Sequence, residues 1–252
     1  MGKKYRMLEE ESIVIDGHKL YRIESLRNFD DVKIGDRGGF IESEMNLSHS
    51  GFCWIYDEAK AFERARVRSG AKLRDHAIAR GFAEITLKAV LTNHAMALNS
   101  ARISGCAKLS ENSLACHAAE IYGRAAILGN SLIGDSALVC GDAEVRDATV
   151  GGFSQIYGSA KVRNARIFGA AEICGNAVIN SDADYIVFKN WWSSGRYFTW
   201  TRSNNAWKVG SFYGDGARLI AAAYEKSETC GREYARIVNY VNSIIEQEKV
   251  QK

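Results

Sequence analysis

The sequence predicts a mainly β protein built around a three-sided parallel β-helix, and three observations support that fold class. A six-residue unit repeats from Cys53 onward: a small residue, any residue, an aliphatic residue, then three positions rich in Gly, Asp, Asn and Ser. One aliphatic position in every three is held by Ala through four successive turns. Two shortened units occur at equivalent places in successive turns.

The repeat is regular enough to give each residue a place on a strand or at a corner. The small residue recurs every six positions from Cys53 to Ala143 and continues to Ala177, giving 22 units. A small residue and an aliphatic residue two positions later face the same side of an extended strand. Gly, Asp and Asn accept the backbone conformation of a corner. Because one such strand cannot bury its face alone, the units are expected to stack.

Sorting the aliphatic positions by every third unit separates three columns. Two columns hold large aliphatic residues throughout, whereas the third holds Ala61, Ala79, Ala97 and Ala115 before Ile133, Val150 and Ile167. The steps from Ala143 to Ala148 and from Ala160 to Ala165 are one residue short and fall at the same corner. Both facts predict three sides and about seven coils, which at about 4.8 Å per coil make a stack roughly 34 Å tall.

The two ends of a β-helix expose unpaired strand edges, so each end is expected to carry a cover. Residues 1–52 are expected to form a β cap, with two strands over 12–26 joined by Asp16-Gly17, a strong hairpin signal. The β-helix is expected over 53–180, and a small α+β domain over 181–252. In that domain strands are expected over 184–192, 196–203 and 206–214, and helices over 217–228 and 232–249.

The composition narrows the classes of protein. With 252 residues, of which 46% are hydrophobic and 25% charged, the chain can bury a sizeable core, and a formal charge of +3 gives no indication of nucleic acid as partner. The N-terminal residues lack the apolar stretch of a signal peptide and no run is long enough to cross a membrane, so we expect a cytoplasmic protein. Six cysteines without a C-x-x-C pair predict neither disulfides nor a zinc site.

The segment 191–207 carries four of the five tryptophans, two arginines and two adjacent asparagines. At least two of these tryptophans are expected in the core of the small domain. In the strand over 196–203, Phe198, Trp200 and Arg202 are expected on one face. Aromatic rings and cations also suit a nucleotide-like ligand or a protein partner. The candidate binding residues are therefore Trp191, Trp192, Arg196, Trp200, Arg202, Asn204 and Trp207.

The hexads, the preceding segment "GDRGGFIESEMNLSHSG" and the tryptophan-rich C-terminal segment resemble a family of phage- and prophage-encoded hexapeptide-repeat proteins, sometimes labelled polymer-forming or acyltransferase-like. The resemblance implies a left-handed β-helix and a homo-oligomer, with a trimer favoured. By analogy with phage accessory proteins it also suggests a non-enzymatic role in evading host defence, by binding a defence protein or sequestering a nucleotide-like molecule. No metal and no cofactor are expected.

Hexapeptide-repeat acyltransferases are also similar, and that resemblance implies a corner histidine acting as general base between subunits. His76 and His94 lie at the same corner of adjacent predicted coils. We favour a solvated polar ladder for them, because corner positions are exposed and the uninterrupted hexads over 53–180 leave no room for a protruding cofactor loop. No catalytic residue is assigned. An acyltransferase and a structural assembly protein remain the alternatives to a binding protein.

Overall fold

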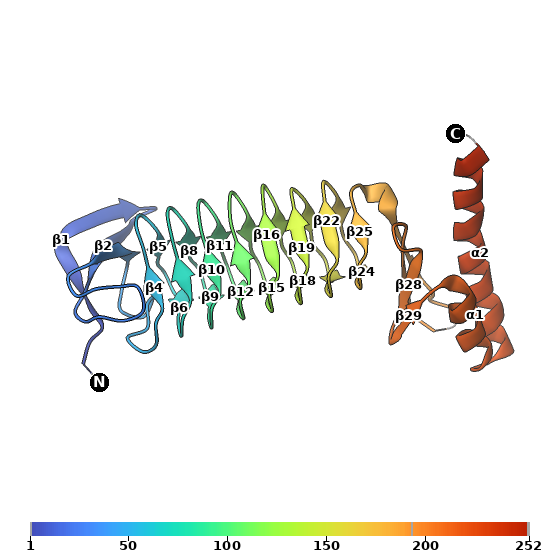
Figure 1. The fold of residues 1–252 in the computed structure, drawn as a ribbon, viewed down its shortest axis with the longest axis horizontal. Coiled ribbons are helices and arrows are strands. Elements are labelled where there is room, and N and C mark those ends of the chain that lie inside the picture. Colours follow the sequence, from blue (N-terminus) through green and yellow to red (C-terminus); the bar gives the residue numbers. More distant parts are fainter. Residues whose placement is uncertain (1, 193, 251–252) are drawn as a thin grey trace.

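The computed structural model describes residues 2–192 and 194–250, without the side chains of residues 249 and 250. Its centre is a long stack of three-sided coils whose short strands pair in parallel, each with the strand three places further along the chain (Figure 1). A hairpin covers the N-terminal end of the stack, and a small sheet with two helices covers the other end. The predicted fold class is confirmed.

Three sheets form the sides. The first contains β3 (Arg37–Ile41), β5 (Lys60–Ala61), β8 (Ile78–Ala79), β11 (Met96–Ala97), β14 (Leu114–Ala115), β17 (Leu132–Ile133), β20 (Thr149–Val150) and β23 (Arg166–Ile167). The second contains β4 (Trp54–Ile55), β7 (Lys72–Leu73), β10 (Val90–Leu91), β13 (Lys108–Leu109), β16 (Ala126–Leu128), β19 (Glu144–Arg146), β22 (Lys161–Arg163) and β25 (Val178–Ile179). The third contains β6 (Arg66–Val67), β9 (Glu84–Ile85), β12 (Arg102–Ile103), β15 (Glu120–Ile121), β18 (Leu138–Val139), β21 (Gln155–Ile156) and β24 (Glu172–Ile173).

The first sheet is the one with the alanine column. Ala79 and Ala97 are paired across β8 and β11, and both are fully buried inside the stack. On the outer side of the same strands the residues are apolar and half-buried in four successive coils: Ile78, Met96, Leu114 and Leu132. This side of the helix therefore places small residues inward and large apolar residues outward.

Parallel stacking begins before the first hexad. β3 pairs with β5, and Leu47 forms a bridge with Val67, so the stack has about eight turns. The turn from Leu47 to Ile55 is two residues longer than the equivalent turn from Val67 to Leu73. The extra residues form a loop at the corner between the third and second sheets.

Polar side chains at the corners tie the coils together. Asp57, Asp75 and Asn93 all have positive φ, and each side-chain oxygen accepts a hydrogen bond from the backbone N–H one coil later. At another corner the side chain is absent instead, because a Cβ on Gly123 would lie 2.9 Å from the backbone of Gly141. The corner composition seen in the sequence thus follows from backbone conformation and from the spacing of the coils.

The two ends of the stack have opposite hydrogen-bonding needs, because each coil donates its N–H groups to the carbonyls of the next coil. The first coil leaves carbonyls without a donor from a preceding coil, and Tyr5 Oη donates to the carbonyl of Leu47 while Lys4 Nζ donates to the carbonyl of Cys53, each over 2.7 Å. The last coil leaves N–H groups, and Thr199 Oγ1 accepts from Glu172 N over 2.9 Å while Ser203 Oγ accepts from Val178 N over 2.7 Å. Each cover therefore satisfies the groups its end exposes.

The N-terminal cover is the predicted hairpin. β1 (Tyr5–Ile15) pairs antiparallel with β2 (His18–Ser25), and the turn is Asp16-Gly17, both with positive φ. β2 pairs in turn with β3, so the hairpin continues the first sheet beyond the first coil.

The C-terminal domain begins with a 3-10 turn, Asp182–Asp184, and an antiparallel sheet of β26 (Tyr185–Lys189), β27 (Tyr197–Thr201), β28 (Ala206–Val209) and β29 (Phe212–Gly214). The helices α1 (Gly216–Tyr224) and α2 (Glu228–Val250) follow. Asp215 accepts a hydrogen bond from Arg218 N and begins α1. Ser227 Oγ accepts one from Cys230 N, which explains why α2 begins four residues earlier than the sequence suggested.

Candidate functional site

Two of the four clustered tryptophans belong to the core. Trp200 on β27 pairs with Trp207 on β28, and both are 1% exposed. They pack with Phe198 and with residues of α1 and α2 in one apolar cluster. The indole Nε1 of Trp200 donates to Asn205 Oδ1 over 2.9 Å, so burial leaves that N–H with a partner. The prediction that at least two tryptophans form the core is confirmed.

Arg202 and Asn204 are held by contacts within the protein. The Arg202 guanidinium pairs with Glu248 near the end of α2 over 2.5 Å and donates to the carbonyl of Ala183 over 3.2 Å. The carboxylate of Glu248 raises the pKa of Arg202. Asn204 Nδ2 donates to the hydroxyl of Tyr213 over 3.1 Å. Both side chains therefore join parts of the C-terminal domain.

Trp191, Trp192 and Arg196 lie instead in the connection between β26 and β27, and all three are exposed. Trp191 has 76% and Trp192 51% of its surface exposed. The two indoles meet edge to face, with ring centroids 5.6 Å apart. Trp192 Nε1 donates to Glu233 Oε2 on α2 over 2.6 Å, so this indole is oriented although it is not buried.

The exposed indoles border an aromatic surface on α2. Trp192, Phe188, Ile237 and Tyr240 line a shallow hollow of about 460 Å³ together with Glu233 and Arg236. Tyr240 is 56% exposed and meets Phe188 edge to face. We call Trp191, Trp192, Phe188 and Tyr240 the aromatic surface. Arg196 lies apart from this hollow, beside Tyr197 and the solenoid residue Phe153.

His76 and His94 stack as predicted, with ring centroids 5.0 Å apart and ring planes 3° from parallel. Both residues are exposed. Within the described part of the chain, neither imidazole has a carboxylate or hydroxyl in hydrogen-bond contact. Two hollows at the surface of the stack are lined by other residues. A general base needs a partner that orients it, and among the described residues no carboxylate or hydroxyl does so for either imidazole.

A cysteine, a histidine and an aspartate meet at another corner, which sequence reasoning missed. Cys116 Sγ lies 3.6 Å from His117 Nδ1, and Asp135 Oδ1 lies 3.6 Å from the same nitrogen. Burial raises the pKa of the Cys116 thiol, and His117 Nδ1 already accepts the backbone N–H of Asp135 over 3.2 Å. An activated cysteine requires a lowered pKa, so the grouping lacks the electrostatics of a nucleophilic site.

Residues 2–192 and 194–250 contain neither a metal-binding cluster nor a membrane-spanning helix. No three His, Cys, Asp or Glu side chains lie close enough together to hold a metal ion. No helix in that part of the chain combines the length and the apolar character needed to cross a membrane.

A known protein is similar to part of this chain. No protein-family model matches the chain. The chain is similar to the uncharacterized acetyltransferase YdcK of Escherichia coli (strain K12), with 36% identity over 87 residues, which is 31% of this chain and 27% of that protein. The chain thus matches about a quarter of that relative's length. The similarity and the parallel solenoid agree with a hexapeptide-repeat β-helix.

Proposed function

We propose that this protein is a non-enzymatic binding protein in which a rigid β-helix displays a recognition surface on its C-terminal domain. The observation that carries the proposal is the exposure of Trp191 and Trp192 in a domain that buries Trp200 and Trp207. Contiguous exposed aromatic area is uncommon on proteins without a partner, and Trp and Tyr concentrate at the centres of protein interfaces.

The shape of the aromatic surface favours a protein partner over a nucleotide-like ligand. Trp191 and Trp192 are perpendicular, with an interplanar angle of 90°. Two perpendicular rings cannot hold a base between them, so this pair offers no sandwich for stacking. A shallow aromatic hollow suits an apolar side chain of a partner.

The resemblance to phage- and prophage-encoded proteins supports a more specific version of the proposal. In that version the chain is an accessory protein in the cytoplasm of the host, and its partner is a host-defence protein. The outward apolar residues of the first sheet support a homo-oligomer, because four successive half-buried aliphatic side chains make a flat strip that a second copy would cover. A trimer would display three aromatic surfaces together.

The test is affinity capture from host lysate with the wild-type protein and with the Trp191→Ala/Trp192→Ala double variant. We expect one or more host proteins to be retained by the wild type and lost from the double variant. Phe82→Ala, which removes an aromatic residue 61% exposed at a corner of the stack, is the matched control and should retain them. Identical sets of proteins from all three baits would contradict the proposal. A small molecule carried only by the wild type would favour the nucleotide-like alternative.

An acyltransferase is the second candidate, and the partial similarity to a protein named as an acetyltransferase favours it. Against it stands the His76–His94 corner, where neither imidazole has an orienting carboxylate or hydroxyl among the described residues. We expect no acetyl transfer or hydrolysis with acetyl-CoA. Activity that disappears in His94→Ala would establish the enzyme in place of the binding protein. A third candidate, a structural assembly protein, predicts an open-ended distribution of mass in sedimentation where we expect one small oligomer.

A further inference from the structure

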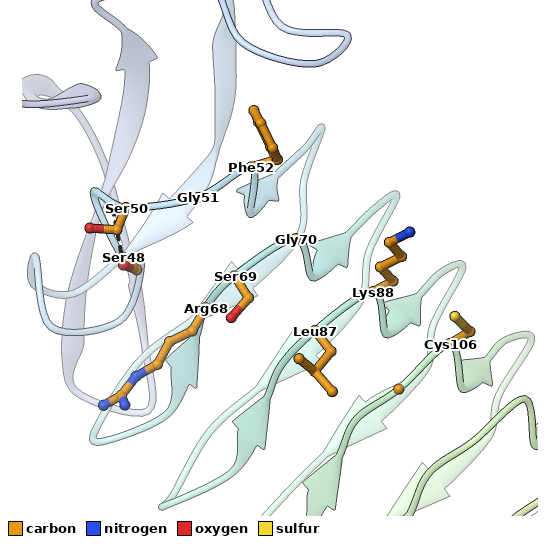
Figure 2. Close-up of a pocket in the computed structure, with 11 residues that line it drawn as sticks. Ser48, Ser50, Gly51, Phe52, Arg68, Ser69, Gly70, Leu87, Lys88 and Cys106 are labelled. Atoms are coloured by element: carbon orange, nitrogen blue, oxygen red, sulfur yellow. Dashed lines mark hydrogen bonds between the residues drawn. The ribbon is translucent and has the colours of Figure 1, made fainter.

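A large hollow on the β-helix lies far from the aromatic surface, at the corner between the third and second sheets. Its volume is about 770 Å³, and it runs over the first coils of the stack (Figure 2). One wall is the loop Ser48–Phe52, where the first coil has two more residues than the others. The lining residues are Ser48, Ser50, Gly51, Phe52, Arg68, Ser69, Gly70, Leu87, Lys88, Gly105 and Cys106.

The groove exists because a side chain is missing between two exposed apolar ones. Phe52, Gly70 and Lys88 hold the same corner position on successive coils, and Figure 2 shows Gly70 on the coil between the other two. Phe52 is 60% exposed and Leu87, on the far side of Gly70, is 55% exposed. Figure 2 shows Phe52 and Leu87 directed to opposite edges of the hollow, and each leaves apolar surface in water that an apolar chain would cover.

Leu87 occupies a backbone position that the rest of its column gives to small residues. Its φ is +59°, and the following residues of that column, from Gly105 to Gly175, are all glycine. Among the described non-glycine residues with positive φ, Leu87 is the single apolar one. Where polar residues such as Asp75 adopt this conformation, their side chain hydrogen bonds the next coil, which leucine cannot do. Stacking therefore gives no reason for a leucine here.

The charges beside the groove select for an anion. Lys88 is exposed, and within the described chain its ammonium forms no ion pair. Arg68 lies at the other side, with its guanidinium 3.7 Å from Glu84. None of the lining residues is acidic. The carbonyls along the groove are already paired, since Leu87 O accepts from Gly70 N and Gly105 O accepts from Lys88 N, each over 2.7 Å. The N–H groups of a peptide strand would find no free acceptor among these carbonyls.

We propose that this groove binds a free anionic amphiphile, a medium-length alkyl chain ending in a carboxylate, with the chain between Phe52 and Leu87 and the carboxylate beside Lys88. Residues 51, 69 and 87 span two coil spacings, about 10 Å. An extended chain advances about 1.2 Å per bond, so an alkyl chain of about ten carbons fills that length.

Decanoate, decylammonium and decanol below their micelle concentrations are the probes, titrated into the full chain by calorimetry. We expect saturable binding of decanoate, weaker binding of decanol and none of decylammonium. Binding should also slow alkylation of Cys106, followed by peptide mass spectrometry, without changing the rate at Cys230. Equal binding of decanoate and decylammonium, or no saturable binding of decanoate, would overturn the proposal.

The decisive variant is Leu87→Gly. It removes one wall of the groove and also places glycine where φ is positive, so it should weaken decanoate binding about tenfold or more while the melting temperature stays equal or rises. Glu111→Gly, at a φ of +61° on another corner, is the matched backbone control and should leave binding unchanged. Lys88→Gln should weaken binding up to about fivefold, and Lys161→Gln should not.

Two results with these variants would contradict the proposal. In the first, Leu87→Gly lowers the melting temperature and leaves decanoate binding unchanged, which would show that Leu87 stabilises the fold and does not contact the ligand. Sedimentation showing a dimer that dissociates in Leu87→Gly, without decanoate binding, would assign the groove to a second copy of the chain.

Discussion

The β-helix and the C-terminal domain use their residues in opposite ways. In the helix a position has one role that is repeated coil after coil, as with the buried alanines Ala79 and Ala97. In the domain, residues of one type have different roles within a short segment, since Trp192 is exposed and Trp200, eight positions later, is buried. In a repeat, the burial of a residue can be predicted from the sequence because the same position recurs in every coil. In a domain without repeats, burial depends on how the strands and helices pack together.

The largest expected effect comes from Trp200. Trp200→Ala removes a buried indole that packs against both helices, and we expect the free energy of unfolding of the C-terminal domain to fall by about 3–5 kcal/mol. Hydrogen exchange in α1 and α2 measures this loss separately from the β-helix. Trp191→Ala is the control and should change the same quantity by no more than about 0.5 kcal/mol. Similar losses in both variants would remove the distinction between core and surface tryptophans.

The next test concerns the alanine column. Ala97→Leu adds a branched side chain where the inward positions of neighbouring coils are also alanine, so overpacking should cost about 1–3 kcal/mol. Ile133→Leu, in the same column where large residues begin, should cost less than about 1.5 kcal/mol. Chemical denaturation followed by far-ultraviolet circular dichroism gives both values. A neutral Ala97→Leu would contradict the repeated role of this position.

A smaller effect is expected where the two regions meet. Thr199→Val keeps the shape of the side chain but removes the Oγ1 acceptor for Glu172 N, and we expect the partly buried N–H left without a partner to cost about 1–2 kcal/mol. Thr149→Val, on an outward position of β20, has no such contact in the described structure and is the control. Exchange of the Glu172 amide should accelerate in the first variant alone; unchanged exchange would mean that this cap is dispensable.

The smallest effect is expected from Arg202. Its ion pair with Glu248 is about a third exposed on the arginine side, with 34% of the side chain open to solvent. Solvent screening limits such pairs, so Arg202→Ala should cost about 0.5–1 kcal/mol and increase amide exchange near the end of α2. If Arg202→Ala lowers the free energy of partner binding by more than it lowers the free energy of unfolding, Arg202 belongs to the recognition surface.

The solenoid can be predicted in detail from the sequence, because each of its positions recurs once per coil. The three columns, the two shortened corners and the Asp16-Gly17 turn are all visible in the sequence. The first coil is not, since the turn from Leu47 to Ile55 departs from the hexad length. The two extra residues of that turn form a wall of the groove. The insertion that breaks the hexad pattern in the sequence is therefore also part of the proposed binding site.

The division of the tryptophans could not be predicted. Alternation along 196–203 placed Phe198 and Trp200 on one face, but it did not show that helices cover that face. Arg202 lies beside the same core because Glu248, far along the chain, reaches back to it. Trp191 and Trp192 are exposed because β26 ends at Lys189, and strand ends depend on pairing with β27. These are tertiary contacts that local patterns do not specify.

The central claim is that Trp200 and Trp207 stabilise the fold whereas Trp191 and Trp192 bind a partner. Calorimetry on the Trp191→Ala/Trp192→Ala double variant, with the host protein that the wild type captures, tests it most directly. We expect a melting temperature within about 2 °C of the wild type and an affinity at least about thirtyfold weaker, which corresponds to roughly 2 kcal/mol at a hot spot. Unchanged affinity, or a weaker affinity accompanied by loss of the folded domain, would contradict it.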